Sequence, residues 1–177
     1  PSASVLQPLR TPCLAPAVQV TKTDQRFMLR GKLDTLLATV ILAQTQFDPK
    51  DRLPGFLKDC LNDLKNWVLQ VLAAEVDGGE PEISGMGGMD ATTLHTVSLA
   101  PERYLKTGHC MADASLGGNV ALLNWLRALA RETEIEALRS LPADGGVCVA
   151  LNRLSSAPYV LMPPTNSGAN NASGKLG

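Results

Sequence analysis

The chain of 177 residues is nearly neutral, with 16 lysines and arginines against 17 aspartates and glutamates, which argues against a broad nucleic-acid-binding surface. Its length fits one domain with a single core, and abundant Leu and Ala with only 4% aromatic residues favour helices packed on helices. No apolar run is long enough to span a bilayer and no signal peptide is recognisable, so we expect no membrane association.

The cysteines point to a reduced protein without a metal site. Cys13, Cys60, Cys110 and Cys148 are widely spaced and form no C-x-x-C pair, so the sequence encodes neither a local zinc site nor a dithiol redox motif. His109 precedes Cys110 directly, and adjacent residues rarely bind one metal ion. We therefore expect no bound metal, free thiols and a cytoplasmic location.

The first half of the chain predicts an arm, two long helices and a loop. Three prolines in residues 1–20 exclude a regular helix and predict an extended or disordered arm. Residues 24–47 form a helix capped by Thr23 or Asp24, and its apolar stripe comprises Leu29, Leu33, Leu36, Leu37, Val40 and Ile41. A second helix is predicted over residues 54–76. The glycine-rich residues 77–99 are predicted to be a flexible loop.

The second half predicts a short helix and two long ones. Residues 101–106 form the short helix, and residues 118–141 form an amphipathic helix whose apolar face comprises Leu122, Leu123, Leu126, Leu129, Ala130 and Leu138. The last helix covers residues 147–162, with a kink or an early end at Pro158 because proline lacks an amide hydrogen. Residues 163–177 carry little apolar content and predict a disordered tail. The fold class is therefore all-α, an antiparallel bundle of four to five helices over residues 21–162.

Charged and polar residues with helical spacing are the candidates for function. Arg127, Arg131 and Glu134 are spaced i, i+4 and i+7, so two guanidinium groups can meet one anionic ligand such as a polyphosphate. A solvated helix face with an Arg131–Glu134 pair is the alternative. Asn152 shares a polar side of the last helix with two serines, and polar groups placed that way inside a bundle usually bond something. Asp34 lies beside an apolar stripe, so its carboxylate must either stay at the edge of that stripe or pair with a cation.

Four blocks of sequence, in order, resemble the ATP:cob(I)alamin adenosyltransferases, most of all the ethanolamine-utilisation type. The blocks are TKTDQRFMLRGKLDTLLA, ERYLKTGHCMADASLGGN, ALLNWLRALARETE and VALNRLSSAPYV. They cover about residues 20–162. The resemblance implies a helical bundle that transfers the 5′-deoxyadenosyl group of ATP to the cobalt of cob(I)alamin, giving adenosylcobalamin and triphosphate.

The resemblance also implies roles for residues of the central and last helices. Arg127 matches the arginine that binds the triphosphate, and Asn152 matches an asparagine that contacts the nucleotide. Arg131 matches an arginine paired with an acid on the first helix of a neighbouring subunit, and Asp34 falls at that acid. Glu134 matches a further active-site acid.

Other positions match less closely. Lys22, Thr23 and Asp24 fall where the family binds phosphate. Met111 falls near an aromatic residue that packs below the corrin ring. Apolar candidates for the cobalamin pocket include Met86 and Met89 as well, although loop filling is the commoner role of such residues. The His and Cys cluster that binds a divalent metal in the ethanolamine type has no counterpart here beyond Cys13.

The resemblance leads to expectations about ligands and partners. The substrates are ATP, with Mg²⁺, and cobalamin, and the assembly is a homotrimer. A cob(II)alamin reductase and an adenosylcobalamin-dependent enzyme are expected as partners, in the cytoplasm and in association with a bacterial microcompartment. Two alternatives are a non-catalytic escort protein that binds corrinoid or nucleotide, and a purely structural helical oligomer.

Overall fold

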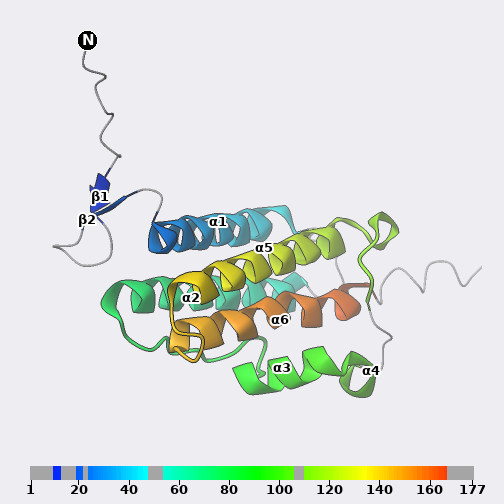
Figure 1. Cartoon of the computed structure of the whole chain (residues 1–177). Coiled ribbons are helices and arrows are strands. Elements are labelled where there is room, and N and C mark those ends of the chain that lie inside the picture. Colours follow the sequence, from blue (N-terminus) through cyan, green and yellow to red (C-terminus); the bar gives the residue numbers. More distant parts are fainter. Residues whose placement is uncertain (1–9, 13–18, 22–23, 48–53, 106–109, 167–177) are drawn as a thin grey trace, which may run out of the picture.

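The structure is a computed structural model that describes residues 10–12, 19–21, 24–47, 54–105 and 110–166. Four long helices dominate it: α1 (Gln25–Gln46), α2 (Pro54–Asp77), α5 (Gly118–Ser140) and α6 (Gly146–Asn166). α1 packs against α2 and α5, and α6 packs against α5 and α2, so the helices close a ring around one core. Packed neighbours run in opposite directions (Figure 1). The predicted all-α antiparallel bundle is confirmed.

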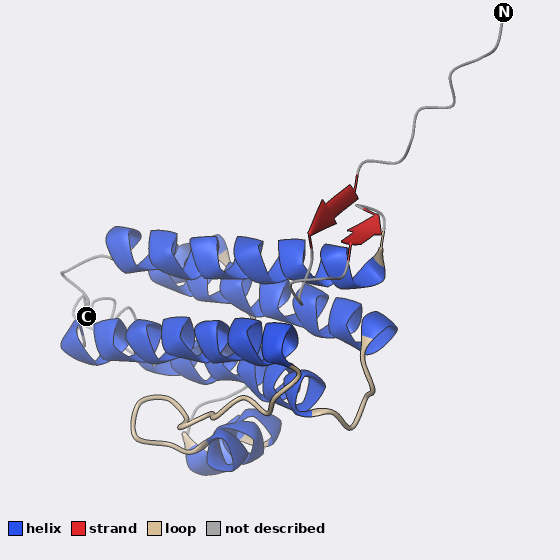
Figure 2. Cartoon of the chain, turned by 90° about the vertical axis from the view of Figure 1, so that its left-hand side faces the viewer, coloured by secondary structure: helices blue, strands red, loops and turns tan. Residues whose placement is uncertain are grey.

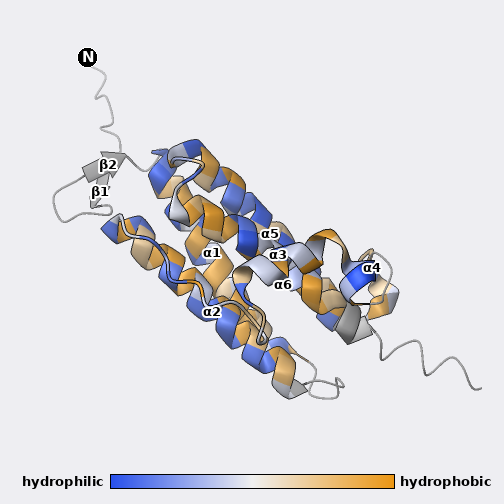
Figure 3. Ribbon diagram, turned by 90° about the horizontal axis from the view of Figure 1, so that it is seen from below, coloured by the Kyte–Doolittle hydropathy of each residue, from blue (hydrophilic) through white to orange (hydrophobic). Residues whose placement is uncertain are grey.

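Leucine-rich stripes on the facing sides of the helices build the core, and hydrophobic residues gather on those sides (Figure 3). On α1 the buried positions follow steps of three and four, as predicted: Leu29, Leu33, Leu36, Val40 and Ala43. Two predicted core residues are exposed instead, Ile41 by 47% and Leu138 by 48%. Each lies at the edge of its apolar stripe. Because 3.6 residues per turn do not match a strict seven-residue repeat, the stripe rotates around the helix and these side chains point outward.

The start of α1 agrees with its predicted cap, whereas the end of α6 differs from the prediction. Asp24 caps α1, because its carboxylate accepts a hydrogen bond from the Arg26 amide at 2.9 Å. α6 continues past Pro158 to Asn166, so the predicted early end is wrong. Ala157, Val160 and Leu161 flank the proline and are at most 2% exposed, and this packing outweighs the loss of one backbone hydrogen bond.

A helical layer beside α6 replaces much of the predicted loop. α3 (Ala91–Leu99) packs on α6 and is followed by α4 (Pro101–Tyr104) and a 3₁₀ turn, η1 (Ala114–Leu116) (Figures 1 and 2). Residues 77–99 were predicted to be a flexible loop, and this prediction is wrong over α3. The helix starts there because the Asp90 carboxylate caps it, accepting from the amides of Thr92 and Thr93 at 2.9 Å. Leu94 and Val97 anchor it in the core.

Two short strands precede the bundle. β1 (Arg10–Pro12) pairs antiparallel with β2 (Gln19–Thr21), with Arg10 opposite Thr21 (Figure 2). β1 lies in the arm of residues 1–20 that was expected to be extended or disordered, and β2 begins there and ends at Thr21. Among the described helices, none is both long and apolar enough to cross a membrane.

Candidate functional site

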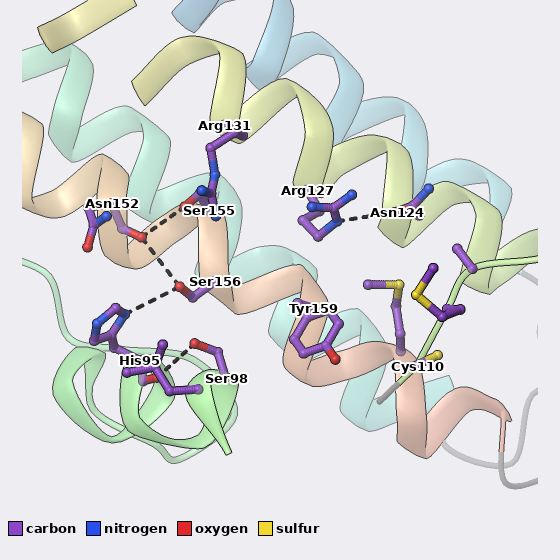
Figure 4. Close-up of a pocket in the computed structure, with 14 residues that line it drawn as sticks. His95, Ser98, Cys110, Asn124, Arg127, Arg131, Asn152, Ser155, Ser156 and Tyr159 are labelled. Atoms are coloured by element: carbon purple, nitrogen blue, oxygen red, sulfur yellow. Dashed lines mark hydrogen bonds between the residues drawn. The ribbon is translucent and has the colours of Figure 1, made fainter. Parts of the chain in front are cut away.

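A cleft of about 560 Å³ opens between α3, α5 and α6, and residues 110–112 also line it. Figure 4 shows the side chains of these elements converging on it. Polar groups line much of its wall, and Leu99, Met111, Ala112 and Met162 contribute apolar or sulfur-containing surface. The polar lining residues are His95, Ser98, Asn124, Arg127, Arg131, Asn152, Ser155, Ser156 and Tyr159.

α5 supplies two arginines, one turn apart as the sequence spacing required. Arg127 donates from Nε to Asn124 Oδ1 at 3.1 Å, and its terminal nitrogens make no hydrogen bond with the described residues. Arg131 places Nε 3.5 Å from Glu134 Oε2, and its side chain is 55% exposed. Both guanidinium groups therefore keep free N–H donors for an anionic ligand in the cleft.

A buried carboxylate connects α5 to α6 behind these arginines. Glu134 is 8% exposed, and its Oε1 accepts from Asn152 Nδ2 at 2.7 Å. Asn152 Oδ1 in turn accepts from Arg153 Nη1 at 3.1 Å. Glu134 Oε2 has no hydrogen-bond partner among the described residues and faces Arg131. Glu134 thus orients the Asn152 amide and holds Arg131, so the structure brings these three predicted residues together.

The polar stripe of α6 faces the same cleft. Ser155 Oγ donates to the Asn152 carbonyl at 2.9 Å, and Ser156 Oγ lies 3.5 Å from the same oxygen. Tyr159 follows one turn later and lines the cleft beside Cys110. Burial raises the pKa of the Tyr159 hydroxyl and of the Cys110 thiol, so both stay protonated at neutral pH.

His95 is one of several wall residues that the sequence did not reveal, with Ser98, Asn124 and Tyr159. It lies on α3, with Nδ1 3.5 Å from Ser156 Oγ (Figure 4). Burial and then the charge of Arg153 lower the pKa of His95, while Glu134 opposes the shift, so the ring is neutral at pH 7. The sequence does contain a sign of this helix: Asp90 followed by two threonines is typical of a helix start. A helix that begins there places His95, Ser98 and Leu99 on one side.

Several predicted site residues lie elsewhere in the chain. Asp34 is exposed on α1, outside the cleft, and pairs with no cation among the described side chains. Met86 is 1% exposed and belongs to the core, while Met89 is half-buried against it. Neither lines the cleft, whereas Met111 does. Asp24 serves as the α1 cap.

Other predictions fall where the structure gives no test. Lys22, Thr23, Cys13 and His109 lie outside the described residues. Within the described ranges, no group of three or more His, Cys, Asp or Glu side chains is placed to hold a metal ion. Cys60, Cys110 and Cys148 are free thiols. The absence of a bound metal in the whole protein stays a prediction.

Comparison with known sequences shows which protein family the chain matches. A family described as cobalamin adenosyltransferase matches residues 11–163. The corrinoid adenosyltransferase EutT of Escherichia coli (strain K12) is 32% identical over 149 residues, which cover 81% of this chain and 54% of that protein. The EutT of Salmonella typhimurium (strain LT2) is 31% identical over the same lengths. The chain spans about half the length of these curated relatives.

Proposed function

Because the chain belongs to the cobalamin adenosyltransferase family, we propose that it transfers the 5′-deoxyadenosyl group of ATP to cob(I)alamin, releasing triphosphate. The likeness to EutT confirms the resemblance to the ethanolamine-utilisation type. One observation carries the proposal: Arg127, Arg131 and Asn152 line one cleft and leave donors open to it. A merely structural bundle has no use for two arginines gathered in this way.

The reaction needs positioning more than acid–base chemistry. The cobalt(I) of the substrate is the nucleophile and forms a bond to C5′ with its own electron pair. The C5′–O bond breaks, and triphosphate leaves with that bond's electrons. Such a step requires cations for the leaving group and a scaffold that holds C5′ over the metal, and the arginines of the cleft wall would supply the cations.

In this proposal Arg127 grips the triphosphate with the nitrogens that it does not share with Asn124. Asn152, held by Glu134, contacts the nucleotide with a preset amide, and Arg131 is held by the same carboxylate. Mg²⁺ would enter bound to the phosphates, since the described residues form no metal-binding cluster of their own.

The corrinoid would lie against the apolar part of the cleft wall. Leu99, Met111, Met162 and the ring of Tyr159 contribute that surface. Met111 is 75% exposed, so it can fold over a ligand, and an apolar cover keeps axial ligands away from the cobalt. Met86 and Met89 would contact the ring only if their turn left the core.

We propose a homotrimer in which Asp34 of one subunit pairs with Arg131 of the next. On α1, Asp34 shares the outer face with Ile41 and Leu42, which are 47% and 43% exposed. On α5, Arg131 borders an outer face that carries Ile135, 47% exposed. One apolar face thus contains an acid with no cation partner among the described side chains, and the other contains a cation with spare donors. This is the complementarity that an interface needs.

The remaining expectations follow from the reaction. Residues 21–162 form the catalytic domain, after the arm of residues 1–20. The tail expected over residues 163–177 overlaps the end of α6, which continues to Asn166. A cob(II)alamin reductase supplies the reduced substrate and an adenosylcobalamin-dependent enzyme takes the product, in the cytoplasm and beside a bacterial microcompartment.

A spectrophotometric assay with ATP, Mg²⁺ and chemically reduced cobalamin tests the activity directly. We expect the absorbance change of cobalt–carbon bond formation, dependent on both ATP and the protein. A chain that binds ATP and corrinoid under strong reductant yet forms no cobalt–carbon product would refute the enzyme and leave the escort function.

A further inference from the structure

Glu75, in the last turn of α2, is a buried acid that the proposed reaction does not use. Its side chain is 0% exposed, and neither carboxylate oxygen accepts a hydrogen bond from the described residues. Its compensation comes from α1: Arg26 Nη2 lies 3.6 Å from Oε1, and Arg30 Nη1 lies 3.8 Å from Oε2. Burial raises the pKa of Glu75 above its ordinary value, and the charges of Arg26 and Arg30 offset only part of that rise. One buried charge therefore faces two cations.

This arrangement opposes the dipoles of both helices. Glu75 is an anion at the negative C-terminal end of α2, and Arg26 and Arg30 are cations in the first two turns of α1, at its positive end. Both ion-pair distances exceed that of a good hydrogen bond. An apolar side chain of similar size would be at least as stable there, because desolvation of a carboxylate is costly. Stability alone does not explain the cluster.

The two arginines have donors to spare. Arg26 and Arg30 are one turn apart, so they lie on the same side of α1, and their side chains are 45% and 37% exposed. Beyond these contacts with Glu75, neither side chain donates a hydrogen bond within the described parts of the chain. Two planar forks, fixed on their inner side by a buried carboxylate and open to solvent on the outer side, suit a phosphate chain.

Their position on α1 relates them to the nucleotide site. Asp34 follows Arg30 by one turn, about 6 Å along the helix. In the proposed trimer Asp34 meets Arg131 of a neighbour, which is itself one turn from Arg127. The α1 arginines of one subunit would therefore approach the phosphates gripped by the neighbour's Arg127.

We propose that Arg26 and Arg30 form a second grip on the polyphosphate of the nucleotide, and that Glu75 is the positioning residue that holds them. The proposal rests on the proposed function, because it takes ATP as the ligand. Glu75 does not touch the substrate, and it acts by fixing two guanidinium groups before the phosphates arrive.

The test compares three variants of the full chain: Glu75→Met, Glu75→Gln and the double variant Arg26→Gln with Arg30→Gln. The control is Glu136→Gln, which alters an acid that is 9% exposed and paired with Arg139 at 3.1 Å on α5, outside the cleft. Calorimetry measures the Kd of ATP with Mg²⁺ and of inorganic triphosphate. Thermal unfolding measures Tm, and light scattering measures the mass of the assembly.

We expect both Glu75 variants and the double arginine variant to weaken ATP and triphosphate binding at least about fivefold, with unchanged cobalamin binding. Glu75→Met should keep or raise Tm, because it removes a desolvated charge and leaves half-exposed arginines behind. A purely structural role of Glu75 predicts the reverse, a lower Tm with normal ATP binding. The control should bind ATP normally.

The inference is overturned if ATP and triphosphate bind within twofold of wild type in folded Glu75→Gln and in the arginine variant. The proposed function then stands, since wild-type turnover is measured separately. If wild type binds ATP but yields no adenosylcobalamin, the function fails and the binding data still decide on Glu75. Absence of ATP binding by wild type would overturn both.

Discussion

Arg127→Ala is the substitution that probes the leaving-group grip most directly. The side chain is half-buried, and its one hydrogen bond within the described residues joins Nε to Asn124 at 3.1 Å. Loss of that bond should cost about 0.5–1.5 kcal/mol of folding stability, so the variant should fold. In the complex, the desolvated guanidinium faces a triphosphate, and truncation of such a charge costs roughly 2–5 kcal/mol.

That range converts to a fall in kcat/KM for ATP of roughly 30- to 4,000-fold. The assay is steady-state formation of adenosylcobalamin from reduced cobalamin, with ATP varied at saturating Mg²⁺. Arg139→Ala is the matched control, because Arg139 is on the same helix and also makes one contact at 3.1 Å, to Glu136, away from the cleft. The control should lower kcat/KM by less than about threefold.

The reasoning is refuted if Arg127→Ala and Arg139→Ala show the same kcat/KM for ATP while both remain folded. In that case the nucleotide does not lie against the α5 face of the cleft. A large loss in both variants would point to a general disturbance of α5 instead.

Four further outcomes are expected. Asn152→Ala should weaken ATP use by about 1–3 kcal/mol, a smaller effect than that of Arg127→Ala. The variant loses a neutral hydrogen bond to the nucleotide and leaves Glu134 without its Asn152 partner; unchanged kinetics would contradict this. Asp34→Ala should lower both the oligomer mass and the turnover, and a fully active monomer by light scattering would contradict the trimer. The pKa of His95 is lower in the folded than in the unfolded chain, so its contribution to stability is complete above about pH 6.5 and is lost as the pH falls below that. Tm measured from pH 7.5 to 5.5 should therefore fall less steeply in His95→Gln than in wild type, and equal slopes would exclude this role. Elemental analysis after chelator treatment should find no zinc or iron, and one equivalent of either would contradict the metal prediction.

Local spacing was sufficient for the four long helices and for the arginine pair. Steps of three and four place Leu29, Leu33 and Leu36 on one side of a helix whatever the rest of the chain does, and the same rule puts Arg127 and Arg131 one turn apart. The order of four sequence blocks was enough to identify the family. All of these are properties of contiguous sequence, so they can be recognised before the chain is folded.

The partners of each helix face were decided by the tertiary structure. Glu134 and Asn152 are 18 residues apart, and only the packing of α5 on α6 brings Oε1 to within 2.7 Å of Nδ2. His95 enters the wall because α3 packs on α6, which no local pattern states. Nothing in the local sequence distinguishes Glu75 from other helix residues, and only the packing of α1 on α2 buries it beside Arg26 and Arg30. Spacing along a helix determines on which side of the helix a residue lies. Long-range packing determines what lies opposite that side, and burial and charge pairing depend on this packing.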